Sequence, residues 1–105
     1  MQLLVVLSTF PDGAAARAAA DALINEQLAA CVNILPGIES VYRWQGKVET
    51  GVEVLALIKT TLECYPQMAK RLHELHPYDV PEIVALPAAS VAESYLAWLT
   101  ENTRA

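Results

Sequence analysis

The densest group of chemically versatile side chains lies in the seven residues from His76 to Glu82, with the sequence HPYDVPE. This segment offers an imidazole, a phenol and two carboxylates, and its two prolines restrict the backbone that presents them. Imidazole and carboxylate groups suit divalent transition metals, so His76, Asp79 and Glu82 are candidate metal ligands. The alternative is structural, because a His-Pro pair also ends a helix, and the imidazole can then bond the last free carbonyl groups.

A second group of side chains could line a pocket for a small ligand. Tyr42 and Trp44 share one face of an expected strand, and the alternative for them is packing across a subunit interface. Lys59 lies at the end of an apolar strand, where a buried ammonium needs a carboxylate such as Glu82 or one from another chain. Together with Tyr78, these residues predict a ligand pocket in a cleft between subunits.

Signatures of common enzymes are missing from the sequence. It contains no GxSxG, GxGxxG, GxxxxGK[ST] or HExxH. Its two cysteines, Cys31 and Cys64, have no CxxC spacing, and with only two histidines a closed zinc site would be hard to assemble. We therefore predict a protein that is not an enzyme and that keeps both thiols reduced and buried.

The 105 residues predict a single domain spanning 1–105. Seven lysines and arginines against twelve aspartates and glutamates give a net charge of −5, which argues against nucleic acid as a partner. Hydrophobic residues make up 54% of the chain, yet its longest apolar stretches are far shorter than the ~20 residues that span a bilayer. The N-terminus lacks the basic segment of a signal peptide, which favours a cytoplasmic protein without a membrane partner.

The apolar pattern predicts four strands that position these side chains, at 2–10, 30–49, 52–60 and 82–86. The second and third strands form a hairpin, with a turn at Glu49-Thr50-Gly51 and a bulge where Pro36-Gly37 interrupts the second strand. Three of the strands are apolar at every position instead of alternating, which leaves a second apolar face that needs a cover. We therefore expect another copy of the chain to cover it.

Helical spacing is expected in three places. The first helix covers 13–28 behind an N-cap at Asp12, and the second carries Pro66 in its first turn and ends at His76. A short third helix opens with a capping box formed by Ser90 and Glu93. The resulting order, β-α-β-β-α-β plus a C-terminal helix, predicts an α+β ferredoxin-like sandwich with an antiparallel sheet.

Four segments of the chain are long and distinctive: 28–37 (LAACVNILPG), 40–47 (SVYRWQGK), 76–83 (HPYDVPEI) and 95–99 (YLAWL). They resemble motifs of the CutA family of divalent-cation tolerance proteins, and the resemblance runs from about residue 3 to residue 102. It implies a ferredoxin-like fold, a tightly interlocked homotrimer and a cytoplasmic location in bacteria. It also implies a role in tolerance to divalent cations, copper binding, and an architecture like that of PII signalling proteins.

The sequence departs from the family at the positions associated with copper. Some members place a Cys at the end of the first strand and a His-His pair at the end of the second helix, where this chain has Ser8 and Leu75-His76. Of these donors only His76 is kept, so the resemblance implies weak Cu²⁺ binding that folding does not require. The expected function is metal tolerance by a trimer that binds metal or a small ligand between subunits. The alternative is a signalling or protein-interaction module like PII, without a physiological metal.

Overall fold

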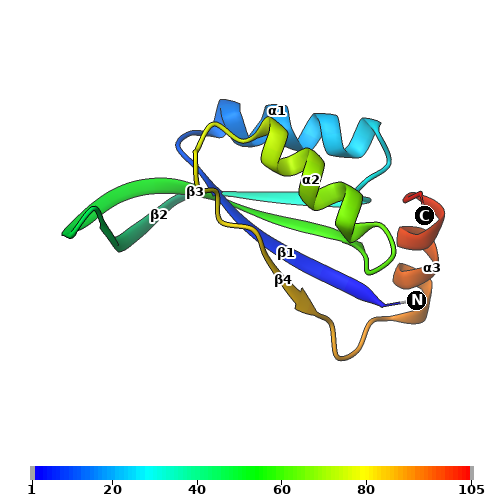
Figure 1. Ribbon diagram of the computed structural model, residues 1–105. Helices are drawn as coiled ribbons and strands as arrows, with labels where there is room; N and C mark the ends of the chain where they lie inside the picture. The colour runs from blue at the N-terminus through cyan, green and yellow to red at the C-terminus, as the bar shows by residue number, and fades with distance from the viewer. Residues whose placement is uncertain (1, 105) are drawn as a thin grey trace.

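The computed structural model describes residues 2–104 of the chain. The elements in chain order are β1 (Leu3–Phe10), α1 (Gly13–Asn25), β2 (Cys31–Trp44), β3 (Lys47–Thr61), α2 (Tyr65–Leu75), β4 (Val84–Pro87) and α3 (Glu93–Glu101). The molecule measures 44 × 26 × 22 Å along its principal axes, because the hairpin of β2 and β3 projects well beyond the helices (Figure 1).

The four strands form one antiparallel sheet in the order β2-β3-β1-β4. Helices α1 and α2 lie side by side over one face of the sheet, and α3 lies at the end of the sheet near both chain termini (Figure 1). This is the predicted α+β ferredoxin-like sandwich with an additional C-terminal helix, and the fold prediction is confirmed. Within residues 2–104, no helix is long and apolar enough to cross a membrane.

The core lies between the helices and the inner face of the sheet, meaning the face that the helices cover. Along β1 the inward side chains of Leu4, Val6 and Phe10 are buried, and the helices contribute Leu23 and Leu72 to the same core. Burial of a side chain of this size stabilises the fold by about 1.5–3 kcal/mol. This apolar layer holds the first and last turns of the helices in place over the strand ends.

The local signals at the helix ends are partly confirmed. Asp12 caps α1, since its Oδ1 accepts a 2.8 Å hydrogen bond from the amide of Ala15, and Pro66 lies in the first turn of α2. The predicted capping box is wrong, because α3 begins at Glu93 with Ala92 as its N-cap residue and no side chain caps it. Ser90 lies too far before the helix for its hydroxyl to reach the free amides of the first turn.

The hairpin of β2 and β3 is longer than predicted. Its turn is at Gln45-Gly46, where both residues have positive φ (50° and 80°), as a two-residue type I′ turn requires. The turn predicted at 49–51 was wrong, since Gly51 lies within β3 opposite Ser40. Gly46, and not Gly51, is the glycine that adopts the positive φ of the tight turn. The strands therefore continue beyond Gly51 to Gln45-Gly46. The predicted bulge is confirmed, because the register of β2 shifts between Leu35 and Ile38.

Beyond this bulge the hairpin has no third strand beside it. Pairing of β3 with β1 stops at Val54 opposite Phe10, so residues 38–53 form a two-stranded ribbon, here called the arm (Figure 1). Every residue from Val41 to Thr50 is exposed in the single chain. A two-stranded ribbon is marginally stable by itself in water, so contacts at its base or along its length must support it.

The outer face of the sheet, opposite α1 and α2, is also apolar. Alternation along the strands places Val5, Leu57, Val84 and Leu86 on it, and the last two are 46% and 47% exposed. At one end α3 packs against β3, which covers only part of this face. The prediction of a second apolar face is confirmed, whereas its covering by another copy of the chain stays a prediction.

Candidate functional site

The candidate site is the loop between α2 and β4, together with the base of the arm beside it. His76 ends α2 as its C-cap residue, and the residue is only 8% exposed. The imidazole Nε2 lies 2.8 Å from the carbonyl oxygen of Thr9, at the end of β1. On the other side of the ring, Nδ1 accepts a 3.1 Å hydrogen bond from the backbone amide of Tyr78. The loop therefore folds back onto β1 through one side chain.

These two partners determine the protonation state of the ring. A carbonyl oxygen only accepts, so Nε2 of His76 must carry the proton, while Nδ1 must present its lone pair to the Tyr78 amide. Burial lowers the pKa of His76 below its usual value, and the hydrogen bond to Thr9 opposes this effect only in part. The imidazole is thus held neutral, with both ring nitrogens engaged.

This geometry bears on the metal that the sequence predicts at His76. A metal needs a ring lone pair, and Nδ1 can supply one only by releasing the amide of Tyr78. Asp79 and Glu82 are exposed, and within residues 2–104 no three His, Cys, Asp or Glu side chains lie together in a way that could hold a metal ion. A single chain does not bring the three predicted metal ligands into one site. The structural alternative also needs correction, because the imidazole bonds Thr9 and not the last carbonyls of α2.

Tyr78 is linked to a residue that the sequence analysis did not single out. Its hydroxyl donates a 2.7 Å hydrogen bond to Oε2 of Glu53, the residue of β3 at the base of the arm. Burial, together with this bond, raises the pKa of Tyr78 well above its usual value, so the phenol stays a donor. The two residues are 25 positions apart, and no local pattern predicts their contact. Only the pairing of β3 with its neighbours could have suggested it.

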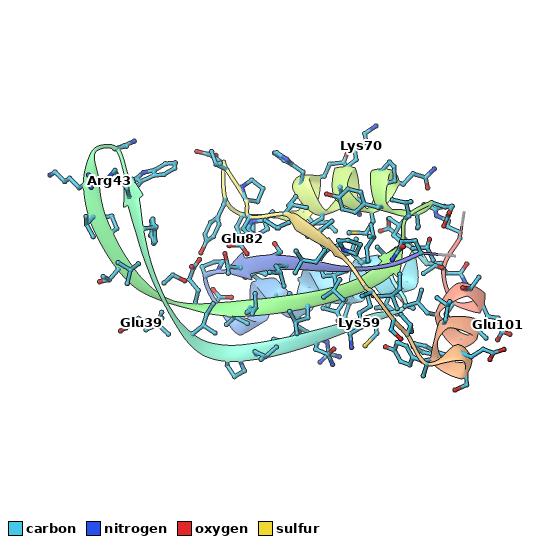
Figure 2. The ribbon with its side chains drawn as sticks, turned by 90° about the horizontal axis from the view of Figure 1, so that it is seen from below. Glu39, Arg43, Lys59, Lys70, Glu82 and Glu101 are labelled. Atoms are coloured by element: carbon cyan, nitrogen blue, oxygen red, sulfur yellow. The ribbon has the colours of Figure 1, made fainter. Side chains whose placement is uncertain are left out.

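The arm carries the two aromatic residues predicted to bind a ligand. Tyr42 lies opposite Glu49 and Trp44 lies opposite Lys47, so both side chains share one face of the arm near its tip. Each aromatic residue is 48% exposed. Arg43, between them in the sequence, marks the same tip, which lies far along the arm from Lys59 (Figure 2). Within one chain the aromatic pair and Lys59 do not line a common pocket.

Lys59 lies on the outer face of the sheet, opposite Cys31 on β2 and Val5 on β1. Its ammonium group is 5.7 Å from the centre of the Tyr95 ring of α3, a distance at which a cation and an aromatic face attract each other. Glu82 precedes β4 on the side of the sheet near the arm, whereas Lys59 lies near α3 (Figure 2). The structure does not bring Lys59 and Glu82 together within one chain, so a pairing between them would need two chains.

The position equivalent to the family's strand-end cysteine is closed to solvent. Ser8 is fully buried on the inner face of β1, and its hydroxyl is a buried side-chain oxygen without a hydrogen-bond partner among the described residues. Ser8 and His76 both belong to the packed interior, so neither is presented at the surface of the single chain. The exposed polar groups of the loop beside these two residues include the carboxylates of Asp79 and Glu82.

The fold defines a class, that of small ferredoxin-like proteins with a long β-hairpin. Its features are an antiparallel sheet with two helices on one face, an uncovered apolar face and a projecting arm. Comparison of the sequence with family models narrows that class. The model described as "CutA1 divalent ion tolerance protein" matches residues 4–102. The chain belongs to this family, which confirms the resemblance seen in its motifs.

Similar proteins come from several kingdoms. The "Divalent-cation tolerance protein CutA" of Thermus thermophilus is 56% identical over 99 residues, which cover 94% of this chain and 96% of the relative. "Protein CutA, chloroplastic" of Arabidopsis thaliana is 45% identical over 96% of this chain, which spans only 56% of that relative. The crystal structure of CutA from Xylella fastidiosa superposes with a TM-score of 0.96 at 39% identity, over 99% of this chain and all of the other.

Proposed function

We propose that this protein acts in tolerance to divalent cations, as the names of its relatives state, and that it does so as a homotrimer. The observation that carries the assembly is the uncovered apolar surface of the outer sheet face and the arm. Val84 and Leu86 on the sheet are nearly half exposed, and Val41, Val48 and Val52 on the arm are 64–72% exposed. Exposed apolar surface on both the sheet and the arm is typical of an interface with another chain.

The two apolar surfaces differ in shape, which favours exchange between copies. The outer sheet face is broad, and the arm is a narrow ribbon that reaches beyond its own body (Figure 1). An arm from one copy can lie against the sheet of the next, and a closed ring satisfies every copy in the same way. Three copies are the number implied by the family resemblance.

We propose that ligand binds in the clefts between copies. In this arrangement Tyr42 and Trp44 of one arm approach the loop of a neighbour that carries Tyr78 and Glu82. Aromatic side chains with a few polar groups around them are typical of small-ligand pockets. Lys59, which has an aromatic but no carboxylate partner within residues 2–104, would pair with a carboxylate of another chain.

Copper is proposed as a weakly held cargo. Among first-row divalent ions, Cu²⁺ has the highest affinity for nitrogen and oxygen donors, so it would bind ahead of the others. His76 could contribute only after Nδ1 releases the amide of Tyr78, which lowers its affinity. Exposed Asp79 and Glu82 would supply oxygen ligands from the same loop.

The assembly is tested by sedimentation equilibrium of the wild-type protein at micromolar concentration. We expect a mass about three times the 11.4 kDa of the chain, as the ring assembly predicts. The substitutions Val48→Lys and Val52→Lys, which place charges on the arm, should release monomers. A monodisperse wild-type monomer would contradict the proposal.

Metal binding is tested by calorimetric titration with Cu²⁺ and Zn²⁺ after removal of metals with a chelator. We expect weak Cu²⁺ binding that is reduced by Glu82→Gln and His76→Ala. The matched control Glu101→Gln changes an exposed carboxylate on α3 and should leave binding unchanged. Tight binding that survives both substitutions at the loop would show that the metal site lies elsewhere. The function itself would be tested in cells that lack their own family member and are exposed to excess metal. The measurement is whether this protein protects them.

The remaining expectations stay proposals. The family name describes a tolerance protein and names no reaction, in keeping with a role other than catalysis. We propose a cytoplasmic location for this chain, although two relatives are named as chloroplastic and one solved relative as periplasmic. Screening with metals, nucleotides and small anions by thermal shift would distinguish a ligand-binding protein from a protein-interaction module, because a specific ligand raises the melting temperature. Recovery of one dominant protein partner without any ligand would favour the interaction module.

A further inference from the structure

The arm leaves the sheet at a defined level. Followed from the body of the protein toward the tip of the arm, β3 pairs with β1 as far as Val54. Glu53, the next residue in that direction, has β2 as its only neighbouring strand. On the facing strand, Glu53 lies opposite Ile38, immediately after the bulge at Pro36-Gly37. A bulge bends and twists its strand, so the direction of the arm is decided at this level.

A third segment of the chain reaches the same level. The Tyr78 hydroxyl donates to Glu53, the Tyr78 amide donates to Nδ1 of His76, and Nε2 of His76 donates to the carbonyl of Thr9. These three hydrogen bonds form a continuous connection from the end of β1, across the loop after α2, to the base of the arm. The rings of His76 and Tyr78 are also in contact, with centroids 4.9 Å apart.

The connection is suited to hold the arm because its parts are stiff. The imidazole of His76 is held on both nitrogens and stacks on Phe10, so Tyr78 starts from a fixed base. A hydrogen bond from a hydroxyl to a carboxylate is shorter and stronger than one between neutral groups. Within the described part of the chain, this is the side-chain hydrogen bond that joins the loop to the arm.

We propose that the hydrogen bond between Tyr78 and Glu53 fixes the angle at which the arm leaves the body of the protein, with Tyr78 as a positioning residue for the arm. Without this bond, the hydrogen bonds that remain at the base of the arm within residues 2–104 are those of the ladder between β2 and β3. The inference deepens the proposed assembly and rests on it for the second of its two measurements, whereas the first is made on the chain itself.

The first measurement is hydrogen–deuterium exchange of the arm amides, followed by mass spectrometry. Tyr78→Phe keeps the ring and its contact with His76 but removes the hydroxyl, and Glu53→Leu removes the acceptor. Each should speed exchange at the base of the arm by about tenfold, while amides of β1 keep their wild-type rates. Glu53→Gln still offers an amide oxygen to the hydroxyl and should exchange close to wild type. Tyr65→Phe is the matched control, because Tyr65 begins α2 at the opposite end of β3 from the arm and its hydroxyl makes no hydrogen bond within residues 2–104.

The double variant distinguishes a direct bond from two separate effects. If the hydroxyl and the carboxylate act through each other, Tyr78→Phe with Glu53→Leu should exchange no faster than either single variant. Additive effects, or arm exchange within about twofold of wild type in both single variants, would overturn the proposal.

The second measurement is the dissociation of the oligomer on dilution, observed by sedimentation. Tyr78→Phe should dissociate at a concentration about tenfold higher than wild type, since a misdirected arm meets its neighbour less often. Equal dissociation alongside unchanged exchange would overturn the inference. A wild-type protein that is monomeric throughout would contradict the proposed assembly alone, because the exchange experiment still measures the role of Tyr78 and Glu53 in the arm.

Discussion

The rings of Phe10 and His76 are stacked, with centroids 4.3 Å apart and planes inclined by 20°. Phe10 is the last residue of β1, and His76 follows the last residue of α2, so this contact closes the core at the end of the sheet nearest the arm. The same ring carries the hydrogen bonds to Thr9 and Tyr78. A residue that the sequence offers as a metal ligand thus acts, within the chain, as a packed and doubly bonded part of the interior.

The burial of His76 predicts how stability depends on pH. In the folded protein the pKa of His76 is lowered, whereas the unfolded chain has the ordinary value near ~6.5. Below about pH 6.5 the unfolded state binds more protons, so the free energy of unfolding falls as the pH falls through the folded pKa. The stabilisation is fully present above about pH 6.5.

Urea unfolding at a fixed protein concentration between about pH 7.5 and about pH 5.5 measures this dependence. His76→Gln should flatten the slope in this range. His73→Gln, which changes an exposed histidine on the same helix, should keep it. Equal slopes for wild type and His76→Gln would show that another group is responsible.

The unpartnered hydroxyl of Ser8 predicts a stabilising substitution. A buried polar group without a hydrogen bond costs about 1–3 kcal/mol, and Ser8 is fully buried. Ser8→Ala should therefore raise the free energy of unfolding by about 1 kcal/mol, measured from the urea midpoint. The control Ser90→Ala changes an exposed serine that caps no helix and should alter stability by less than about 0.5 kcal/mol. A loss of stability in Ser8→Ala would mean that the hydroxyl has a partner.

The backbone of Gln27 predicts a second stabilising change. Gln27 has a φ of 58°, in the left-handed region that a side chain makes costly by about 1–2 kcal/mol. Gln27→Gly removes that cost but adds freedom to the unfolded chain, so we expect a net gain of about 0.5 kcal/mol. Gln27→Val should lower stability by more than about 1 kcal/mol, because a β-branched residue fits this region poorly. Thermal unfolding of the two variants should show shifts of opposite sign.

The extent of the apolar core predicts that folding does not need a metal. The helices and the inner sheet face pack through residues such as Val6, Leu23 and Met68, each fully or almost fully buried. Dialysis against a chelator should leave the circular dichroism spectrum unchanged and the melting temperature within about 1 °C of the untreated protein. Loss of the fold on chelation would show that a metal contributes to structure. Addition of Cu²⁺ to the chelated protein should restore any change if that metal is the one lost.

Local sequence determined much of the fold, because short-range chemistry specifies strand and helix ends. Asp12 offers a carboxylate to the free amides that follow it, Pro66 lacks only an amide that the first turn of α2 does not use, and Pro36-Gly37 cannot continue a regular ladder. The unbroken apolar runs likewise predicted two apolar sheet faces, since residues alternate between faces whatever lies beyond them.

Where two local signals competed, the sequence pattern could not choose between them. Both Gln45-Gly46 and Thr50-Gly51 can form a turn, and register with β2 over the whole hairpin selected the first. Ser90 offered a cap, but α3 starts where Leu99 can be buried, and that start lies beyond the reach of the Ser90 hydroxyl. Packing along an entire element outweighs a single turn or cap, which contributes only about 1 kcal/mol.

The role of His76 was decided by tertiary structure alone. Its partner Thr9 lies 67 positions away, and Tyr78 meets Glu53 only because β3 runs past the end of β1. An imidazole in a His-Pro-Tyr segment has the same chemistry whether it faces solvent or the core, so the sequence identified the group and its possible uses. Burial against Phe10 and the positions of two backbone groups determined which use the folded chain makes of it, since only the assembled sheet places them around the ring.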